Sequence, residues 1–489
     1  MHLFVGPSLR SHRPQGLRQL ALVLGCWVAT ALLALAAPLT AEGKEKRPSK
    51  SAKAKGAMAA KEKAPKRSER APKRSERAPK RSERAPKRPE RAPKRPERAP
   101  IHAPIPFDRT GLGQPAAIFD PSTTALQAWH TALDAALTGN RVARMAVYGA
   151  SHTAADLWTG ELRRRLQSRY GDAGHGFLVP AKWNLGYRHQ DLVVEASQGW
   201  QIARHLRVQG DAVGDFGLAG LRMLSNNPLD FAQIRTTAAN PLGRSADRLE
   251  LWFRSTPQGG DLAVELNGSK ESITCRGDEG VTRKIWQMID GPKDLRLAPV
   301  GNGMVAIDGV VVERGTKGVV VDQLGIPGMQ AEIHLHWTET PWAQQLQWRQ
   351  PDLIVLAYGT NDIAQADETM DHYLQVWRQV LARVRKAAPQ ASCLIVGPTD
   401  RLTRDDRKRW ISLPRTQDVI ETQRKAAAMA GCGHWDARAA MGNDGAMLRW
   451  KKAGLATNDR VHLTRDGYSR LAELFDIALH RGLPQRKPE

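Results

Sequence analysis

Apolar strand patterns and helical patterns alternate in two parts of this chain. The runs RMAVYG (144–149), PDLIVLAYGTND (351–362) and SCLIVGP (392–398) are largely apolar, which is typical of central strands in a parallel sheet. Four segments that follow such strands carry apolar residues at helical spacing: 154–170, 366–387, 416–430 and 464–480. The alternation of strands and helices predicts an α/β fold.

A different pattern fills the middle of the chain. Short β segments are separated there by Gly, Asn and Asp, as in HLRVQG (205–210), MVAIDGVVVE (304–313) and GVVVDQL (318–324). Many short strands with turn signals predict an antiparallel β-sandwich, which we place at 195–320. The sandwich would interrupt a single α/β domain made of two stretches: 104–194 and 321–489.

The N-terminal segment, residues 1–41, combines three arginines, no acidic residue and an apolar run from Leu20 to Ala37. This is the composition of a signal peptide, and ALA at 34–36 suits cleavage. A run of this length can also just span a bilayer, so an uncleaved signal anchor is the alternative. Both interpretations predict an exported protein of the periplasm or cell envelope.

A seven-residue repeat, APKRSER and then APKRPER, runs from Ala64 to Arg98. Proline in every unit opposes helix formation, so residues 42–103 are predicted to be a disordered basic linker. It could attract an anionic envelope polymer or a membrane surface, or serve only as a solvated tether. Residues 42–100 carry +15 of the net charge of +23, and 101–489 carry only +5 without interleaved aromatics, so no nucleic-acid partner is expected.

After the apolar N-terminal run, three cysteines remain, and their spacing matches no zinc site. Cys393 and Cys432 lie near two predicted strands. They could form a disulfide in an oxidising compartment or remain buried free thiols. His334 and His336 form an H-x-H pair without a neighbouring carboxylate or cysteine cluster, so no metal is expected.

Polar residues with catalytic potential stand at the predicted strand ends. Ser151 follows the first strand, Asn361 follows the strand that ends at Tyr358, and Asp459 and His462 precede the last helix. Functional groups of open α/β sheets gather at the carboxyl ends of the strands, so we expect these residues to meet. Taken singly, each has an ordinary explanation as a helix cap, a turn residue or a surface histidine.

Together these residues suit acyl transfer. His462 can take the proton of Ser151, and Asp459, three residues away, can accept the other ring proton and fix the tautomer. The side-chain amide of Asn361, the backbone N–H of Ser151 and a loop glycine, Gly328, would stabilise the oxyanion.

Substrate-binding candidates are weaker. His152 would form a wall of the pocket, and Gly325 is the other glycine of the loop DQLGIPGMQ (322–330). Tryptophans can stack on sugar rings, although most of them serve in core packing. Four tryptophans could stack on sugar near the site: Trp183, Trp200, Trp342 and, as the substrate-binding candidate, Trp435.

In order, these blocks resemble the SGNH (GDSL-type) hydrolase superfamily, named for serine, glycine, asparagine and histidine. The resemblance matches Ser151, Gly328, Asn361 and His462, with Asp459 in the family's Asp-x-x-His pattern, and covers about 125–195 and 320–480. It implies a three-layer αβα, flavodoxin-like hydrolase domain that needs no cofactor. Ala150 stands where the family usually has the loop-organising Asp.

The inserted sandwich, GDAGHGF (171–177) and HWDARAAMG (434–442) are similar to exported bacterial O-acetylpeptidoglycan esterases. The resemblance implies a serine esterase that hydrolyses O-acetyl esters on an envelope polysaccharide such as peptidoglycan, with the sandwich binding the carbohydrate. Two alternatives stay open. An O-acetyltransferase would use the same residues, and a non-catalytic polysaccharide-binding protein would use only the sandwich and the basic linker.

Overall fold

The computed structural model describes residues 112–139, 141–205 and 213–481. The expected export segment (1–41) and basic linker (42–103) lie outside the described residues, and so does most of the predicted strand at 205–210. Within the described ranges, no helix is both long and apolar enough to cross a membrane.

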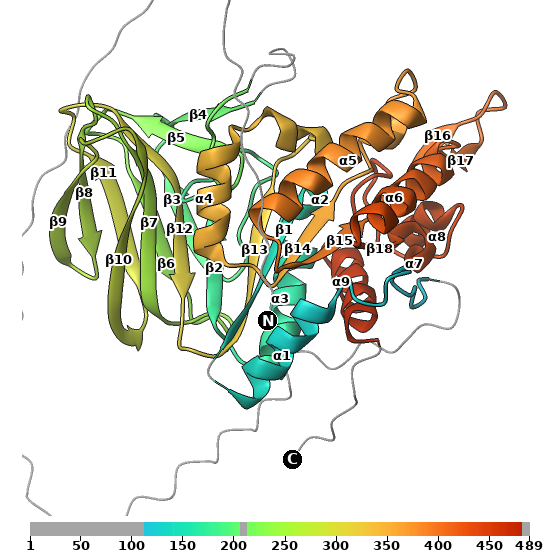
Figure 1. Cartoon of the computed structure of the whole chain (residues 1–489), viewed down its shortest axis with the longest axis horizontal. Coiled ribbons are helices and arrows are strands. Elements are labelled where there is room, and N and C mark those ends of the chain that lie inside the picture. The colour runs from blue at the N-terminus through green and yellow to red at the C-terminus, as the bar shows by residue number, and fades with distance from the viewer. Residues whose placement is uncertain (1–111, 140, 206–212, 482–489) are drawn as a thin grey trace, which may run out of the picture. The chain divides into compact units, whose positions relative to one another are not determined.

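Five parallel strands form the central sheet, in the order β13-β1-β14-β15-β18 (Figure 1). Their bounds are β1 Val142–Gly149, β13 Gly318–Gly325, β14 Leu353–Ala357, β15 Ser392–Val396 and β18 Gly433–Trp435. Almost every residue of these strands is buried, which explains their nearly continuous apolar sequences.

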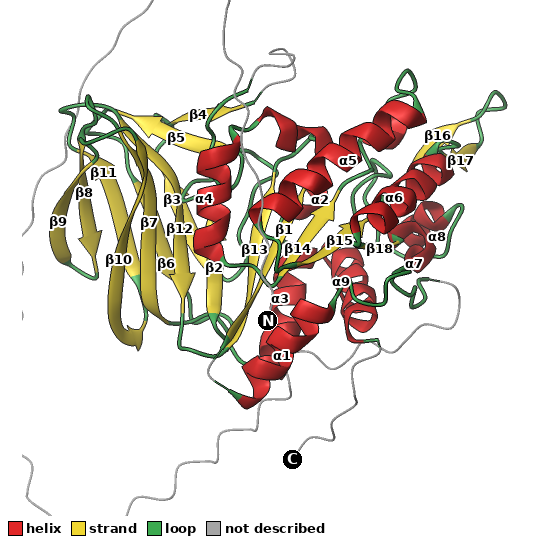
Figure 2. Cartoon of the chain, viewed as in Figure 1, coloured by secondary structure: helices red, strands yellow, loops and turns green. Residues whose placement is uncertain are grey.

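Helices cover both faces of this sheet (Figure 2). Successive side chains of a strand point to opposite faces, so Met145 and Val147 pack with α1, α3 and α9, whereas Ala146 and Tyr148 pack with α4, α5 and α6. The helices are α1 Gln127–Thr138, α2 Ser151–Ala154, α3 Trp158–Tyr170, α4 Glu339–Arg349, α5 Met370–Ala387, α6 Thr416–Ala430, α7 Ala437–Met441, α8 Ala446–Lys452 and α9 Arg465–His480. The predicted three-layer αβα fold is thereby confirmed.

The helix predicted at 154–170 is interrupted. Asp156 has a φ of 49°, in the left-handed region, so the helix cannot run through it. The side chain of Asp156 instead accepts hydrogen bonds from Thr159 and Arg163 of α3. The four-residue α2 and the longer α3 are consequently separate elements.

Two antiparallel sheets stand beside the parallel one (Figure 1). One has the order β10-β7-β12-β5-β4, with β2 also paired to β12, and the other has the order β3-β6-β11-β8-β9. Ile234 and Leu295 of one sheet and Leu249 and Val312 of the other line the same small cavity, so the sheets pack face to face. The strands are β2 Gly174–Leu178, β3 Leu192–Ala196, β4 Gln201–Arg204, β5 Leu221–Ser225, β6 Ala232–Thr236, β7 Ala246–Ser255, β8 Asp261–Leu266, β9 Ser269–Thr274, β10 Gly280–Gly291, β11 Asp294–Pro299 and β12 Val305–Glu313.

Three strands lie differently from the sequence prediction. β2 and β3 begin before residue 195 but pair within the antiparallel sheets, whereas β13, predicted as a sandwich strand, pairs in parallel with β1. A Val-rich run bounded by glycines suits either kind of sheet, because only the long-range pairing distinguishes them. A hairpin of β16 (Leu402–Arg404) and β17 (Trp410–Ser412) was not predicted at all.

A buried ionic network joins the sandwich to the parallel sheet. Arg349 at the end of α4 donates to Glu313 of β12 and to both carboxylate oxygens of Asp322 on β13, each at 2.9 Å. Arg144 of β1 also donates to Glu313, at 3.1 Å. Burial alone would raise the pKa of Glu313, but Arg349 and Arg144 lower it to about 2, so this carboxyl is ionised in the folded chain.

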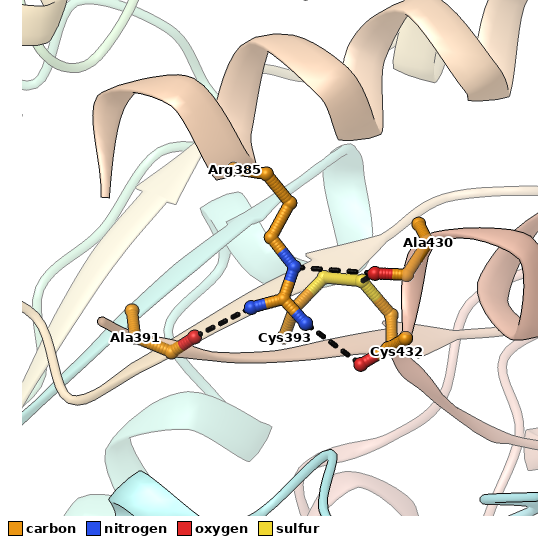
Figure 3. Close-up of a disulfide and its surroundings, with 6 residues drawn as sticks. Arg385, Ala391, Cys393, Ala430 and Cys432 are labelled. Carbon is orange, nitrogen blue, oxygen red and sulfur yellow. Dashed lines mark hydrogen bonds between the residues drawn. A yellow bond between two sulfur atoms is a disulfide. The ribbon is translucent and has the colours of Figure 1, made fainter. Parts of the chain in front are cut away.

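A disulfide between Cys393 and Cys432 ties the start of β15 to the residue before β18 (Figure 3). Arg385 of α5 lies over it and donates to the backbone oxygens of Ala391, Ala430 and Gly431. Of the two possibilities that the sequence left open for these cysteines, the structure has the pair. Cys275 is a buried free thiol.

Replacing Arg349 with Met should lower the free energy of unfolding by about 3–5 kcal/mol, because Glu313 and Asp322 then remain buried without their shared partner. Denaturant unfolding at neutral pH measures this loss. Arg378→Met on the exposed face of α5 is the control. A loss no larger than that of the control would show that the network does not hold the two parts together.

Removing the disulfide by Cys393→Ala with Cys432→Ala should cost about 4 kcal/mol, since the bond closes a loop with a sequence separation of 39. Thermal unfolding of the oxidised wild type, the reduced wild type and the double variant measures the effect. Reduced wild type should resemble the double variant. If reduction left the unfolding temperature of the wild type unchanged, the bond would contribute nothing to stability.

Candidate active site

A sharp turn presents Ser151 at the end of β1. Gly149 closes the strand, Ala150 turns the chain, and Ser151 begins α2. A Cβ atom on Gly149 would lie 2.2 Å from Thr153 Oγ1, so only glycine lets the helix fold back this closely on the strand. The Ser151 side chain thereby stands at the carboxyl end of the sheet, where the sequence placed it.

His462 lies between Ser151 and Asp459. Its Nε2 is 2.8 Å from Ser151 Oγ, and its Nδ1 is 2.7 Å from Asp459 Oδ2. A carboxylate can only accept, so Nδ1 carries the ring proton and Nε2 is left to accept a proton from the serine. The three residues named from the sequence are therefore brought together, although Ser151 and His462 are 311 positions apart.

Asp459 is held ionised by its own loop. Partial burial raises its pKa, but hydrogen bonds from Thr457 Oγ1, from His462 and from the backbone of Val461 lower it far below the ordinary value for a carboxyl. The side chains of Asp459 and His462 are 50% and 38% exposed, so solvent reaches this end of the site. Thr457, two residues before Asp459, is a contributor that sequence reasoning missed.

The residues proposed for the oxyanion come from the ends of adjacent strands. The order β13-β1-β14 puts Ser151 between the loop of Gly328 and the loop of Asn361. Gly149 is in register with Gly325 on one side and with Ala357 on the other, so the three loops start level with one another.

The two flanking loops are joined to each other. Asn361 Nδ2 donates to the backbone oxygen of Met329 at 2.8 Å, which leaves its second amide hydrogen for another acceptor. Gly328 is exposed with a φ of 82°, and an added Cβ would meet no atom within 4 Å. Backbone conformation rather than space therefore favours glycine at this position.

His152 lies against the ring of His462, with the ring centroids 5.2 Å apart. Its Nδ1 is 2.8 Å from the hydroxyl of Tyr468, another residue that the sequence did not single out. Burial lowers the pKa of His152 to about 3, with a smaller contribution from His462, so it is neutral at physiological pH. His152 thus packs against the imidazole ring of His462, the candidate base. Its expected role in substrate binding stays a prediction.

Gly325 does not have the position expected for a substrate-binding loop residue. It is the last residue of β13, and a Cβ there would lie 2.3 Å from the backbone nitrogen of Ala154. Its lack of a side chain lets α2 pack onto the sheet.

The prediction that Trp435 stacks on a sugar ring is wrong. It is 1% exposed on β18, packs on Phe475 with ring centroids 4.9 Å apart, and donates to the backbone oxygen of Ala116. Trp342 and Trp200 are also buried, at 1% and 8% exposed. Trp183 is half-buried beside Tyr187, so its role stays a prediction.

A buried ion pair fixes the turn after α2. Asp156 accepts from Arg163 and from the backbone nitrogen of Gln190, and Arg163 lowers the pKa of Asp156 to about 2 against the opposing effect of burial. The spacing of Asp156 and Arg163 at i and i+7 is a weak signal, because many surface pairs share it. In the described residues, no three His, Cys, Asp or Glu side chains are grouped as a metal site.

Comparison with known proteins finds one family match and a shared fold. Residues 302–470 match the model of the GDSL-like Lipase/Acylhydrolase family. A solved structure described as a peptidoglycan O-acetylesterase in action superposes with a TM-score of 0.62 at 24% sequence identity, covering 74% of this chain and 98% of that one.

Two further solved structures match more loosely. A family two carbohydrate esterase from Cellvibrio japonicus gives a TM-score of 0.24 at 11% identity, covering 59% of this chain and 98% of that chain. An acetyl xylan esterase gives 0.25 at 20% identity, covering 33% and 80%. No curated protein sequence matches the chain. Residues 302–470 thus resemble the GDSL-like lipases and acylhydrolases, which are carboxylic ester hydrolases, and the chain shares the fold of a solved esterase of that kind.

Proposed function

We propose that this chain is a serine esterase that removes O-acetyl groups from a cell-envelope polysaccharide, with peptidoglycan as the first candidate. The observation that carries the proposal is the continuous hydrogen-bonded chain from Ser151 Oγ through the His462 ring to Asp459. A serine hydroxyl is a weak nucleophile by itself and needs an adjacent base to take its proton.

In the first half of the reaction, Ser151 Oγ attacks the acetyl carbonyl carbon while His462 Nε2 takes the hydroxyl proton. Asp459 stabilises the imidazolium that forms and holds the ring in orientation without itself becoming protonated. His462 then gives its proton to the sugar oxygen as the ester bond breaks, which leaves an acetyl group on Ser151.

In the second half, His462 takes a proton from a water molecule that attacks the acetyl-enzyme, and acetate leaves as Ser151 regains its proton. Both halves pass through a tetrahedral oxyanion. The backbone N–H groups of Ser151 and Gly328 and the free amide hydrogen of Asn361 are the donors that we assign to it, each worth roughly 3–4 kcal/mol.

The substrate that we infer is an O-acetylated polysaccharide. The fold shared with a peptidoglycan O-acetylesterase supports an O-acetylated glycan, and the β-sandwich would help to bind the polymer. The expected signal at 1–41 and the Cys393–Cys432 disulfide support an exported enzyme in an oxidising compartment, the periplasm or cell envelope. The basic linker at 42–103 would add attraction to anionic envelope polymer or membrane.

Ser151→Ala should abolish acetate release from p-nitrophenyl acetate and from O-acetylated peptidoglycan, with kcat reduced by at least about a thousandfold. Ser168→Ala, on the exposed face of α3, is the matched control and should retain full activity. Spectrophotometric and chromatographic assays of acetate release provide the two readouts.

The outcomes separate the alternatives. Activity on the small ester alone would keep the chemistry and move the substrate elsewhere. Acetate release that falls when a sugar acceptor is added would favour an acetyltransferase. Wild type without turnover on both substrates would contradict an esterase and favour a polysaccharide-binding protein.

Asp459→Asn should lower kcat by about a hundredfold or more, because the amide would donate to Nδ1 and leave the ring proton on Nε2. The pKa of Asp459 is well below 3.8, so wild type should lose no activity through protonation of this residue between pH 7 and that value. The pH profiles of kcat for wild type, for Asp459→Asn and for the control Asp418→Asn on the exposed face of α6 measure both effects. Unchanged kcat in Asp459→Asn would remove Asp459 from the mechanism.

A further inference from the structure

Four arginines belong to or contact the segments that carry Ser151, Asn361, Asp459 and His462, and we refer to them as the arginine collar: Arg188, Arg401, Arg460 and Arg465. Arg188 and Arg465 are exposed, and Arg401 and Arg460 are half-buried. They come from three segments that are far apart in the sequence, because Arg460 and Arg465 lie only five positions from each other.

Two members flank the residues assigned to the chemistry. Arg401 Nη1 donates to the backbone oxygen of Thr360 at 2.9 Å, and Thr360 directly precedes Asn361. Arg460 directly follows Asp459, in a left-handed conformation with a φ of 57°. A non-glycine residue in that conformation is strained, which is common where a loop is shaped for function.

The other two members lie on the side of α2. The backbone nitrogen of Arg188 donates to the backbone oxygen of Ala154, the last residue of the helix that Ser151 begins. Arg465, three residues after His462, donates from Nη1 to Gln190 Oε1 at 3.3 Å. The collar residues are thus attached to the loops of Asn361 and Asp459 and to the segment that contacts α2.

Unlike the interior arginines, the collar has no carboxylate partners. Arg163, Arg222 and Arg349 are buried, and each forms an ion pair with an aspartate. None of the collar residues forms an ion pair with any carboxylate in 112–139, 141–205 or 213–481. The nearby carboxylate of Asp459 is already engaged by Thr457, His462 and backbone N–H groups.

An aromatic support adds to this charge. The guanidinium carbon of Arg460 lies 4.0 Å from the ring centroid of Trp410 on β17, and that of Arg404 lies 4.3 Å from the same centroid. Arg460 Nε is buried without a hydrogen-bond partner among the described residues. Two like charges over one ring leave positive potential beside the catalytic loop, which an anion would find favourable.

We propose that the arginine collar binds carboxylates of the substrate polymer, so that the enzyme acts on anionic O-acetylated glycans in preference to neutral ones. This inference rests on the proposed esterase function. Guanidinium groups match carboxylates in a two-point geometry, and open positive charge at the mouth of a site also draws anionic substrates toward it.

The test compares soluble O-acetylated peptidoglycan fragments with the same fragments after their carboxylates have been converted to amides. For wild type, kcat/KM should be about tenfold higher on the carboxylate form, and salt at about 0.5 M should remove most of that preference. Arg188→Gln with Arg465→Gln, both at exposed positions, should reduce the preference, and adding Arg401→Gln should remove most of the remainder. Arg378→Gln on α5 is the control and should keep it.

Hydrolysis of p-nitrophenyl acetate by wild type distinguishes the two levels of the proposal, because it tests the ester chemistry without a charged polymer. If wild type hydrolysed this ester but acted equally fast on the carboxylate and amide fragments, carboxylate binding by the collar would be contradicted. The proposed esterase function would not be affected. A preference that persists in the triple variant, with its thermal unfolding unchanged, would assign carboxylate binding to other residues.

Discussion

The alignment of three parallel strands is the constraint on which the rest of the site depends. β13, β1 and β14 end level with one another, with Gly149 paired to Gly325 and to Ala357. Side chains and N–H groups that follow these strands must therefore emerge together, as Ser151 does at its sharp turn. The sandwich fills the connection between the first strand and its neighbour β13, and the network centred on Arg349 holds it against that sheet.

Arginines in the interior are paired with carboxylates, whereas those near the candidate active site are not paired within the described part of the chain. Inside, each strongly buried guanidinium meets a carboxylate, because an unpaired charge there would cost several kcal/mol. Near the candidate active site, Arg401 and Arg465 donate to neutral oxygens and Arg460 lies on Trp410. Unpaired positive charge is inexpensive in contact with water, so it can remain available for an anionic substrate. The buried arginines thus stabilise the fold, and the arginines near the active site are available to bind an anionic substrate.

The sequence predicted the fold class and the order of the triad, because buried parallel strands and the Asp-x-x-His spacing are local patterns. It could not place β13 correctly, since a Val-rich strand looks alike in either kind of sheet until its partner is known. The misjudged Trp435 and Gly325 share this cause: burial at 1% and a 2.3 Å approach to Ala154 depend on packing between distant segments. Asp156 ended its helix through contacts that form only in the folded chain.

The central claim is that Ser151 carries the acyl group during turnover. Rapid acid quenching of wild type mixed with excess p-nitrophenyl acetate, followed by proteolysis and mass spectrometry, tests it most directly. The peptide containing Ser151 should gain the mass of one acetyl group, and fragmentation should place it on this serine. Hydrolysis with the acetyl group on a different residue, or on none while Ser151→Ala still turns over, would contradict it.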